Sequence, residues 1–392
     1  MSHTRTRRAV ARGFTLIELL VATLLSGVVL SSIYFVFIAN SKQYYTQEQV
    51  VQMQETMRFA LEVMKNDLRN AGQLAIVNGT ADAVKDAGYC GPLAANLRAV
   101  DLLNNNGPAA PAALGANNNA LVPDQIRVLT DVSGGTLLAA TVAGGTIKIR
   151  PAAQQISRAA MDVVSNAARL TQMYKVNYFV RVLDQSGQFD LVPMTGVAQD
   201  GAGWLLTLER APCVAGIDEV RVNAVAVIRY RIQPDDSAVG QNKTDLMRET
   251  LSATDMATVL RGLSVAEFAI NLQVWGTYDT RAGAGDPPNI PADISPGNDV
   301  GNTAGNDEAA TFNTQPHRIR ALSILLATRS AREDADLRTA PDLAKPPAQR
   351  IAADRTWFDV SPQNAGDAPN YARVTTLTAR VETPNLRTEG NP

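Results

Sequence analysis

The sequence predicts an α+β fold, in which a long N-terminal helix packs with its second half on an antiparallel β-sheet head with long loops. An apolar N-terminal segment continues into a stretch whose apolar residues recur every three or four positions, which is typical of one long helix. Beyond Gly72, stretches of alternating apolar and polar residues are separated by loops rich in Gly, Pro, Asn and Ala. Such a pattern is typical of strands and their connections.

The composition makes most metal and triad chemistry improbable. The chain has 392 residues, 45% of them hydrophobic, so it can bury a sizeable core. It contains only two histidines and two cysteines. A structural zinc site usually needs about four Cys or His ligands that lie close together. A catalytic triad needs a histidine in the folded body, and only His317 qualifies because His3 lies in a basic tail. We therefore expect no enzymatic activity, no metal and no cofactor.

The N-terminal 39 residues predict the cellular location. Residues 1–13 contain four arginines, at positions 5, 7, 8 and 12, and no acid. Residues 14–39 are apolar apart from Glu18. As a helix they would be about 39 Å long, which is enough to cross a hydrocarbon core of about 30 Å. Arginines before such a segment stay in the cytoplasm, so we expect one pass through the inner membrane and a periplasmic head.

Three interpretations of this segment compete. A secretory signal peptide needs small residues at a cleavage site after the apolar run, but the run ends VFIAN at residues 36–40. A plain membrane anchor explains the length and the arginines. It does not explain Glu18, because a carboxylate within an apolar membrane helix costs about 2.5–3.5 kcal/mol and usually marks a function.

The third interpretation comes from a resemblance. Residues 12–21, RGFTLIELLV, resemble the cleavage and methylation motif of type IV prepilins. The resemblance implies that a prepilin peptidase cuts between Gly13 and Phe14 and methylates the new amine of Phe14. It also implies that Glu18 pairs with the Phe14 amine of a neighbouring subunit inside a filament. This agrees with the physical requirement that a carboxylate in an apolar setting finds a cation.

The helix is expected to continue beyond the membrane, from about residue 14 to about residue 68. Residues 47–70 are more polar but keep an apolar row, which we interpret as core packing on one helix face. The row consists of Met53, Met57, Ala60, Leu61, Met64 and Leu68. Asn70-Ala71-Gly72 is a typical C-terminal stop. No proline precedes Pro92, and since many major pilins have one in this helix, its absence favours a minor component.

The head is expected to be one β-rich globular body at residues 73–392. The predicted strands are 125–129, 176–183, 203–210, 220–232, 265–278, 320–328 and 373–381, with a short helix within 151–166. In 220–232 the polar Arg221, Asn223, Arg229 and Arg231 share one parity, which predicts a sheet with one face covered. Loops at 104–120, 281–314 and 339–350 are predicted to be exposed connections. The preceding parts are a leader at 1–13, a membrane or filament-core helix at 14–39 and an amphipathic extension at 40–72.

The order of segments in the head is similar to that of the PilW group of minor pilins. The similarity covers residues 123–128, 220–232, 265–276, 317–330 and 371–387. It includes an Arg-rich strand before a charged turn and a last strand ending in Leu386-Arg387. This group resembles the J-type minor pseudopilins of type II secretion. The head is longer than expected for those pseudopilins, which favours the pilus.

Cys90 and Cys213 are the only cysteines, and both follow the membrane segment. In an oxidising periplasm an even pair usually forms a disulfide. Here it would close a loop of roughly 120 residues and contribute about 4–5 kcal/mol in the loop-entropy model. Two free buried thiols are the alternative. A redox role is disfavoured because the two cysteines lack a C-x-x-C spacing.

Three further features of the sequence have simple structural interpretations. The acidic loop 293–308 offers oxygen ligands suited to calcium, but it lacks the EF-hand order and is interpreted as a solvated loop. His317 is interpreted as a structural or surface histidine, since Arg318 and Arg320 disfavour its protonation. Removal of the leader takes four of the 36 basic residues and leaves 32 against 38 acidic ones. With no basic-aromatic cluster, this charge argues against nucleic-acid binding.

The sequence therefore predicts a minor pilin that helps to start assembly of a type IV pilus, at or near its tip, and supports adhesion and twitching motility. The expected partners are a prepilin peptidase, other minor pilins, the major pilin and a large tip adhesin. After assembly the protein is expected on the pilus fibre at the cell surface. A minor pseudopilin of type II secretion is the first alternative. A mainly adhesive or ligand-binding subunit, with the long loops as its contact surface, is the second.

Overall fold

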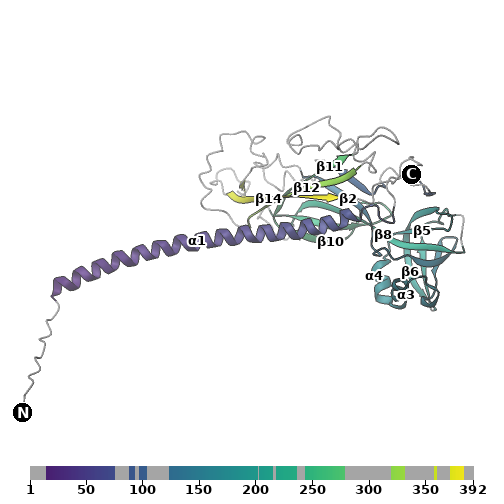
Figure 1. Ribbon diagram of the computed structural model, residues 1–392, viewed down its shortest axis with the longest axis horizontal. Helices are drawn as coiled ribbons and strands as arrows, with labels where there is room; N and C mark the ends of the chain where they lie inside the picture. The colour runs from purple at the N-terminus through teal and green to yellow at the C-terminus, as the bar shows by residue number, and fades with distance from the viewer. Residues whose placement is uncertain are drawn as a thin grey trace, which may run out of the picture. The chain divides into compact units, whose positions relative to one another are not determined.

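The computed structural model describes residues 15–75, 88–92, 97–103, 123–201, 203–214, 218–235, 243–278, 319–331, 357–359 and 371–383. The chain divides into two compact units, Met1–Gln52 and Met53–Pro392. Helix α1 (Leu16–Arg69) runs through both, and the described strands lie in the second unit (Figure 1). A long apolar helix followed by an antiparallel β-rich head confirms the predicted α+β class.

Helix α1 has the two halves that its sequence predicts. The described side chains at its start are exposed, as Leu16 at 82% and Phe35 at 70% illustrate. In the second half, every member of the predicted apolar row is buried. The helix ends after Arg69: the amide of Ala71 donates to the carbonyl of Leu68 at 3.2 Å, and Gly72 has a φ of +73°. A left-handed residue at this place is most easily a glycine, which confirms the predicted stop.

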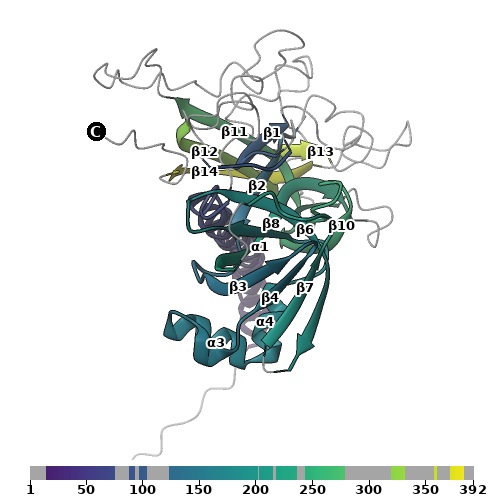
Figure 2. The same cartoon turned by 90° about the vertical axis from the view of Figure 1, so that its right-hand side faces the viewer.

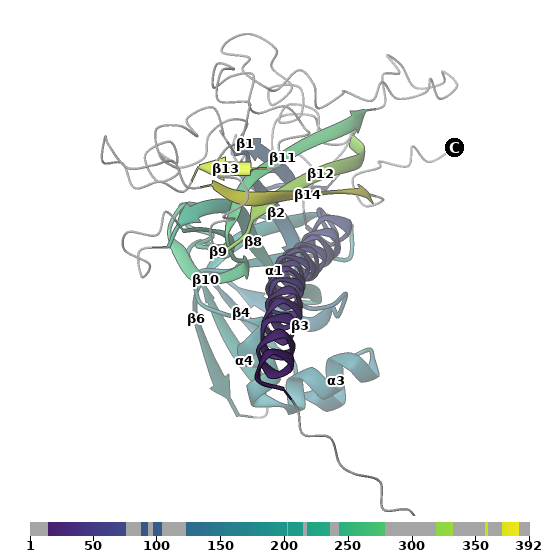
Figure 3. The same cartoon turned by 90° about the vertical axis from the view of Figure 1, so that its left-hand side faces the viewer.

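Two antiparallel sheets pack around the second half of α1 (Figure 3). One contains β1 (Val100–Leu103), β2 (Gln125–Asp131), the second half of β8 (Val220–Pro234), β9 (Thr244–Leu251) and β10 (Val259–Ala266), in that order. The other has the order β11 (Ala269–Tyr278), β12 (Ile319–Arg329), β14 (Tyr371–Glu382) and β13 (Trp357–Asp359). Both sheets contribute apolar side chains to one core with α1, which we call the helix core.

The first half of β8 belongs to a closed barrel. From β8 the pairing passes through β3 (Leu138–Ala143), β4 (Thr146–Ile149), β7 (Gly203–Leu208), β6 (Phe189–Asp200) and β5 (Phe179–Leu183), and then returns to β8. Val222 shows the closure, because it pairs with Leu138 on one side and with Val182 on the other. Helices α3 (Arg158–Ser165) and α4 (Ala167–Met173), preceded by the short η2 (Ala152–Gln154), lie beside one end (Figure 2). Apolar residues of the barrel strands and of these helices form a second core, which we call the barrel core.

The structure corrects several predicted elements. The predicted strand 265–278 is interrupted by a turn at Phe268, whose φ is +55°, and is divided between β10 and β11. Strands β1, β3, β4, β6, β9 and β13, most of β10, and helix α4 were not predicted. The prediction that β8 has one covered face is wrong for its centre. There, Val225 and Val227 lie in a third cluster with Leu129 and Leu251, so both faces are buried.

Candidate processing and assembly site

Glu18 lies in the first turn of α1 and forms a reciprocal cap with Thr15. The amide of Glu18 donates to Oγ1 of Thr15 at 3.3 Å. In return, Oε2 of Glu18 accepts long hydrogen bonds from the amide of Thr15 at 3.4 Å and from its hydroxyl at 3.5 Å. This is a capping box, in which two side chains satisfy backbone donors that the helix leaves unpaired. The Thr-x-x-Glu spacing is the sequence signal for this cap, and it is separate from the charge argument for Glu18.

The surroundings of Glu18 are apolar and uncovered. Its neighbours Ile17 and Leu19 are 72% and 62% exposed. Within the described part of the chain, Glu18 forms no ion pair. A carboxylate is favoured at a helix N-terminus by the helix dipole, and here it is presented on an otherwise apolar surface. The predicted processing residues Gly13 and Phe14 lie outside the described residues, as do His3, His317 and the acidic loop 293–308.

The apolar part of α1 is the described segment that could cross a membrane, by length and composition. Its apolar side chains are exposed all around the helix. A helix that is apolar on every side needs an apolar environment around it, either lipid or other helices. This half of α1 therefore fits a membrane anchor.

The second half of α1 is attached to the head by a buried polar contact as well as by its apolar row. Asp67, in the last turns of the helix, accepts a hydrogen bond from the hydroxyl of Tyr230 on β8 at 2.5 Å and from Nε of Arg248 on β9 at 2.7 Å. Burial, followed by the charge of Asp67, raises the pKa of Tyr230. Burial alone would lower the pKa of Arg248, but the hydrogen bond and charge of Asp67 raise it. The contact thus holds a charged arginine against a buried carboxylate.

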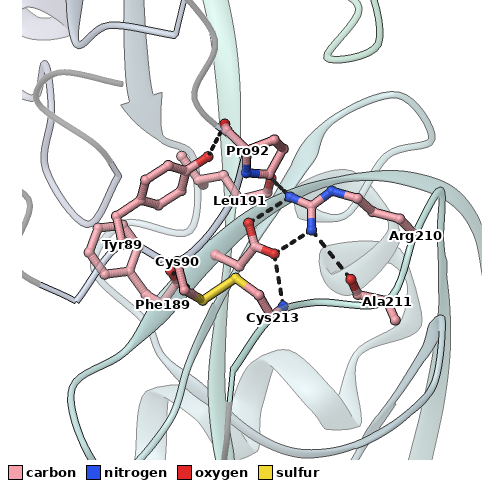
Figure 4. Close-up of polar contacts among 9 residues, drawn as sticks. Tyr89, Cys90, Pro92, Phe189, Leu191, Arg210, Ala211 and Cys213 are labelled. Carbon is pink, nitrogen blue, oxygen red and sulfur yellow. Dashed lines mark hydrogen bonds and ion pairs between the residues drawn. A yellow bond between two sulfur atoms is a disulfide. The ribbon is translucent and has the colours of Figure 1, made fainter. Parts of the chain in front are cut away.

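Cys90 and Cys213 are bonded, with an S–S distance of 2.10 Å and a Cα–Cα distance of 5.8 Å (Figure 4). Beside them lies Asp190, which is fully buried. Its carboxylate accepts hydrogen bonds from Nη1 and Nη2 of Arg210 at 2.5 and 2.7 Å, and from the amide of Cys213 at 3.1 Å. The hydrogen bond to Asp190 raises the pKa of Arg210. The sequence indicated the cysteine pair but gave no signal for this ion pair, whose residues are 20 positions apart.

The described residues contain no group of three or more His, Cys, Asp and Glu side chains that could hold a metal ion. Several of their buried acids form ion pairs with arginines. Asp101 binds Arg98 and Arg127, and Glu249 binds Arg229 and Arg231. These contacts join neighbouring segments of the head and are structural.

Residues 8–34 match the family model of the prokaryotic N-terminal methylation motif. No curated protein and no solved structure gives a significant match to the chain. The matched segment includes Gly13, Phe14, Thr15 and Glu18, and it extends into the apolar half of α1. A prepilin-type motif implies processing by a prepilin peptidase and assembly with other pilins, and it points to a structural subunit rather than an enzyme. Together with the apolar helix and the β-rich head, the motif supports a membrane-anchored, type IV pilin-like protein.

Proposed function

We propose that this protein is a PilW-like minor pilin that helps to start assembly of a type IV pilus and lies at or near its tip. The observation that carries the proposal is the methylation motif at residues 8–34, with Glu18 in the first turn of an exposed apolar helix. The size of the head supports a position at the end of the filament. A head with a barrel as well as the helix core is harder to fit between lateral neighbours than at a tip.

Three residues carry the proposed processing and assembly. The peptidase cuts between Gly13 and Phe14, the amine of Phe14 is methylated, and Glu18 pairs with that amine on a neighbouring subunit. In the low dielectric of packed apolar helices, a paired carboxylate and ammonium are far more favourable than either charge alone. Cleavage therefore creates the cation that Glu18 requires.

The proposed topology follows from the charges that flank the apolar segment. The leader at 1–13, with its four arginines, stays in the cytoplasm, residues 14–39 cross the inner membrane, and the head folds in the periplasm. The amphipathic extension ends with the stop at Gly72, and residues 73–392 form the head. On assembly the protein leaves the membrane for the pilus fibre, where other minor pilins, the major pilin and a tip adhesin are its partners.

A minor pseudopilin of type II secretion is the alternative, because the same N-terminal motif serves that assembly. A mainly adhesive subunit is a further alternative, with the long loops as the contact surface. A deletion strain separates the three functions. Loss of pili supports the proposal, loss of secreted substrates with normal pili supports the pseudopilin, and normal pili that no longer adhere support the adhesive subunit.

Intact mass spectrometry of the membrane-extracted protein tests the processing. We expect a chain that begins at methylated Phe14, and accumulation of the unprocessed precursor when Gly13 is replaced by leucine, because a side chain there obstructs the peptidase. Gly27→Leu is the matched control: Gly27 lies within α1, after the cleavage site, and an added Cβ there has no atom within 4 Å. A wild-type chain that retains residues 1–13 in cells with an active peptidase would contradict the assignment.

A further inference from the structure

A short segment of the chain, residues 88–92, lies along an edge of β6 that β7 leaves free. Strand β5 pairs with β6 from Phe189 onward, whereas the pairing with β7 starts only at Met194. On the open edge, the amide of Phe189 donates to the carbonyl of Gly88 at 2.7 Å, and the amide of Cys90 donates to the carbonyl of Phe189 at 3.0 Å. The segment thus closes the start of β6.

Residues 88–92 pack closely against the side chain of Asp190. A Cβ added to Gly91 would lie 2.2 Å from Oδ1 of Asp190 and 2.5 Å from the hydroxyl of Tyr89, so a larger residue requires one of these side chains or the segment to shift. The same carboxylate is held by Arg210 and by the amide of Cys213, both in the chain that leaves β7. The disulfide therefore joins residues 88–92 to the chain that follows β7, next to the carboxylate that this part of the chain binds (Figure 4).

The segment also covers the junction between the barrel and the open sheet. The rings of Tyr89 and Phe189 are 5.5 Å apart. Phe189 belongs to the third cluster, which joins β5 and β6 of the barrel to Leu129 of β2 and Leu251 of β9. Release of residues 88–92 would remove Tyr89 from this cluster and remove, among the described residues, the backbone partner of Phe189 on this edge of β6.

We propose that the Cys90–Cys213 disulfide is a redox-dependent latch for this junction. When it is closed, it holds residues 88–92 on β6, and when it is reduced, the segment detaches while the helix core stays folded. Closure removes two protons and two electrons from the two thiols, and a disulfide-carrying thiol oxidoreductase accepts them and becomes a dithiol. Cys213 is exposed and Cys90 half-buried, so the bond is accessible to such an enzyme.

The physical reason for local opening is the small number of backbone hydrogen bonds that join this short segment to β6. In the described part of the chain, two backbone hydrogen bonds link residues 88–92 to β6, rather than an extended ladder. Such segments open at a lower free energy than the core does. An unpaired strand edge is prone to pair with other chains, so oxidation of the latch would be a condition for a soluble, mature head. The inference does not depend on the proposed pilus function.

Hydrogen exchange on the full-length protein in detergent tests the latch. The wild-type chain is first treated with a thiol-labelling reagent under denaturing, non-reducing conditions, and we expect no label on either cysteine. Labelling of both cysteines would overturn the proposal. We then compare it with the double variant Cys90→Ala/Cys213→Ala. We expect protection of the Phe189 amide to fall roughly tenfold or more beyond any fall at Tyr230 in the helix core, and chymotrypsin to cut after Tyr89. A fall in protection at Phe189 that is equal to or smaller than the fall at Tyr230 would overturn the proposal, because the disulfide would then stabilise the whole fold and not this segment.

Two further variants keep the test specific. Gly91→Ala retains both cysteines but displaces the segment, so it should raise exchange at Phe189 and leave Tyr230 unchanged; wild-type protection at Phe189 would overturn the proposal. Val163→Ala is the matched control, because Val163 is fully buried in the barrel core and its truncation changes neither the disulfide nor residues 88–92. It lowers global stability and should produce no excess exchange at Phe189.

Discussion

At the scale of single residues, Glu18 combines two roles that the sequence does not separate. It caps its own helix through Thr15, and it presents a negative charge on an apolar surface. The first role needs a hydrogen-bond acceptor, which either a carboxylate or an amide provides. The second needs a charge that can meet a neighbour's amine. Alanine removes both roles, so an alanine variant alone cannot distinguish them.

We predict that Glu18→Gln leaves membrane insertion and cleavage intact but reduces incorporation into the assembled filament. Glutamine keeps the cap and loses the charge, so the neighbour's methylated amine has no partner. The measurement is the amount of protein in the sheared filament fraction relative to the membrane pool, with Glu18→Ala in parallel. Wild-type incorporation of the glutamine variant, with a defect only for alanine, would assign Glu18 a capping role instead. A subunit at the tip has no neighbour on one side, and we therefore expect a partial defect.

At the scale of elements, α1 is attached to the head by its apolar row and by one buried ion pair. Asp67 sits near the C-terminus of the helix, where the dipole disfavours a negative charge. Arg248 and Tyr230 compensate from two neighbouring strands. Removal of a carboxylate from such a contact leaves an arginine and a hydroxyl unpaired, which costs more than the contact itself contributes.

We predict that Asp67→Ala lowers the free energy of unfolding by about 3 kcal/mol, the lower end for a broken buried pair because the Arg248 side chain is 27% exposed. Tyr230→Phe should cost only about 1–2 kcal/mol, since it removes one hydrogen bond and leaves the ion pair. Urea unfolding of the full chain in detergent measures both. Equal losses for the two variants would show that the ion pair contributes little.

At the scale of the whole head, two cores share the long strand β8, and each contains a buried tyrosine. Tyr230 lies in the helix core, and Tyr174 lies in the barrel core with its hydroxyl donating to the carbonyl of Val222 at 3.1 Å. Burial is the main cause that raises the pKa of both phenols, with the charge of Asp131 adding to it for Tyr174. Both therefore stay neutral in the folded head at pH values where free tyrosine ionises.

We predict that the head is progressively destabilised as pH rises above about 10. The ordinary tyrosine pKa is 10.0, so the unfolded chain loses these protons there while the folded chain keeps them. By linkage, the stabilisation that the two neutral buried tyrosines contribute is complete below that pH and is lost as the pH rises above it. Arg329, whose pKa burial lowers to about 10, acts in the opposite sense. Near-ultraviolet titration should show tyrosines that ionise only on unfolding, and Tyr174→Phe/Tyr230→Phe should weaken the pH dependence.

Local patterns predicted part of this architecture. The apolar row of α1, the stop at Gly72 and the strands β2, β5, β7, β8, β12 and β14 follow from spacing and alternation. The short barrel strands escaped prediction because β3 and β4 contain four to six residues, too few for a clear period. Alternation predicts an uncovered face along the whole of β8, but its central Val225 and Val227, which continue the parity of Arg221 and Asn223, are buried. Whether such positions are covered depends on segments distant in sequence.

The sequence by itself determined the prepilin-type motif, the apolar and amphipathic halves of α1, and the cysteine pair, because each depends on residues close together or on simple counts. Only the tertiary structure decided that β8 serves two cores, that Asp67 contacts Tyr230 and Arg248, and that Asp190 binds Arg210 and the amide of Cys213. These contacts join residues as many as 181 positions apart. Their partners are selected by how the strands pair and which faces become buried, and a local pattern contains no information about either.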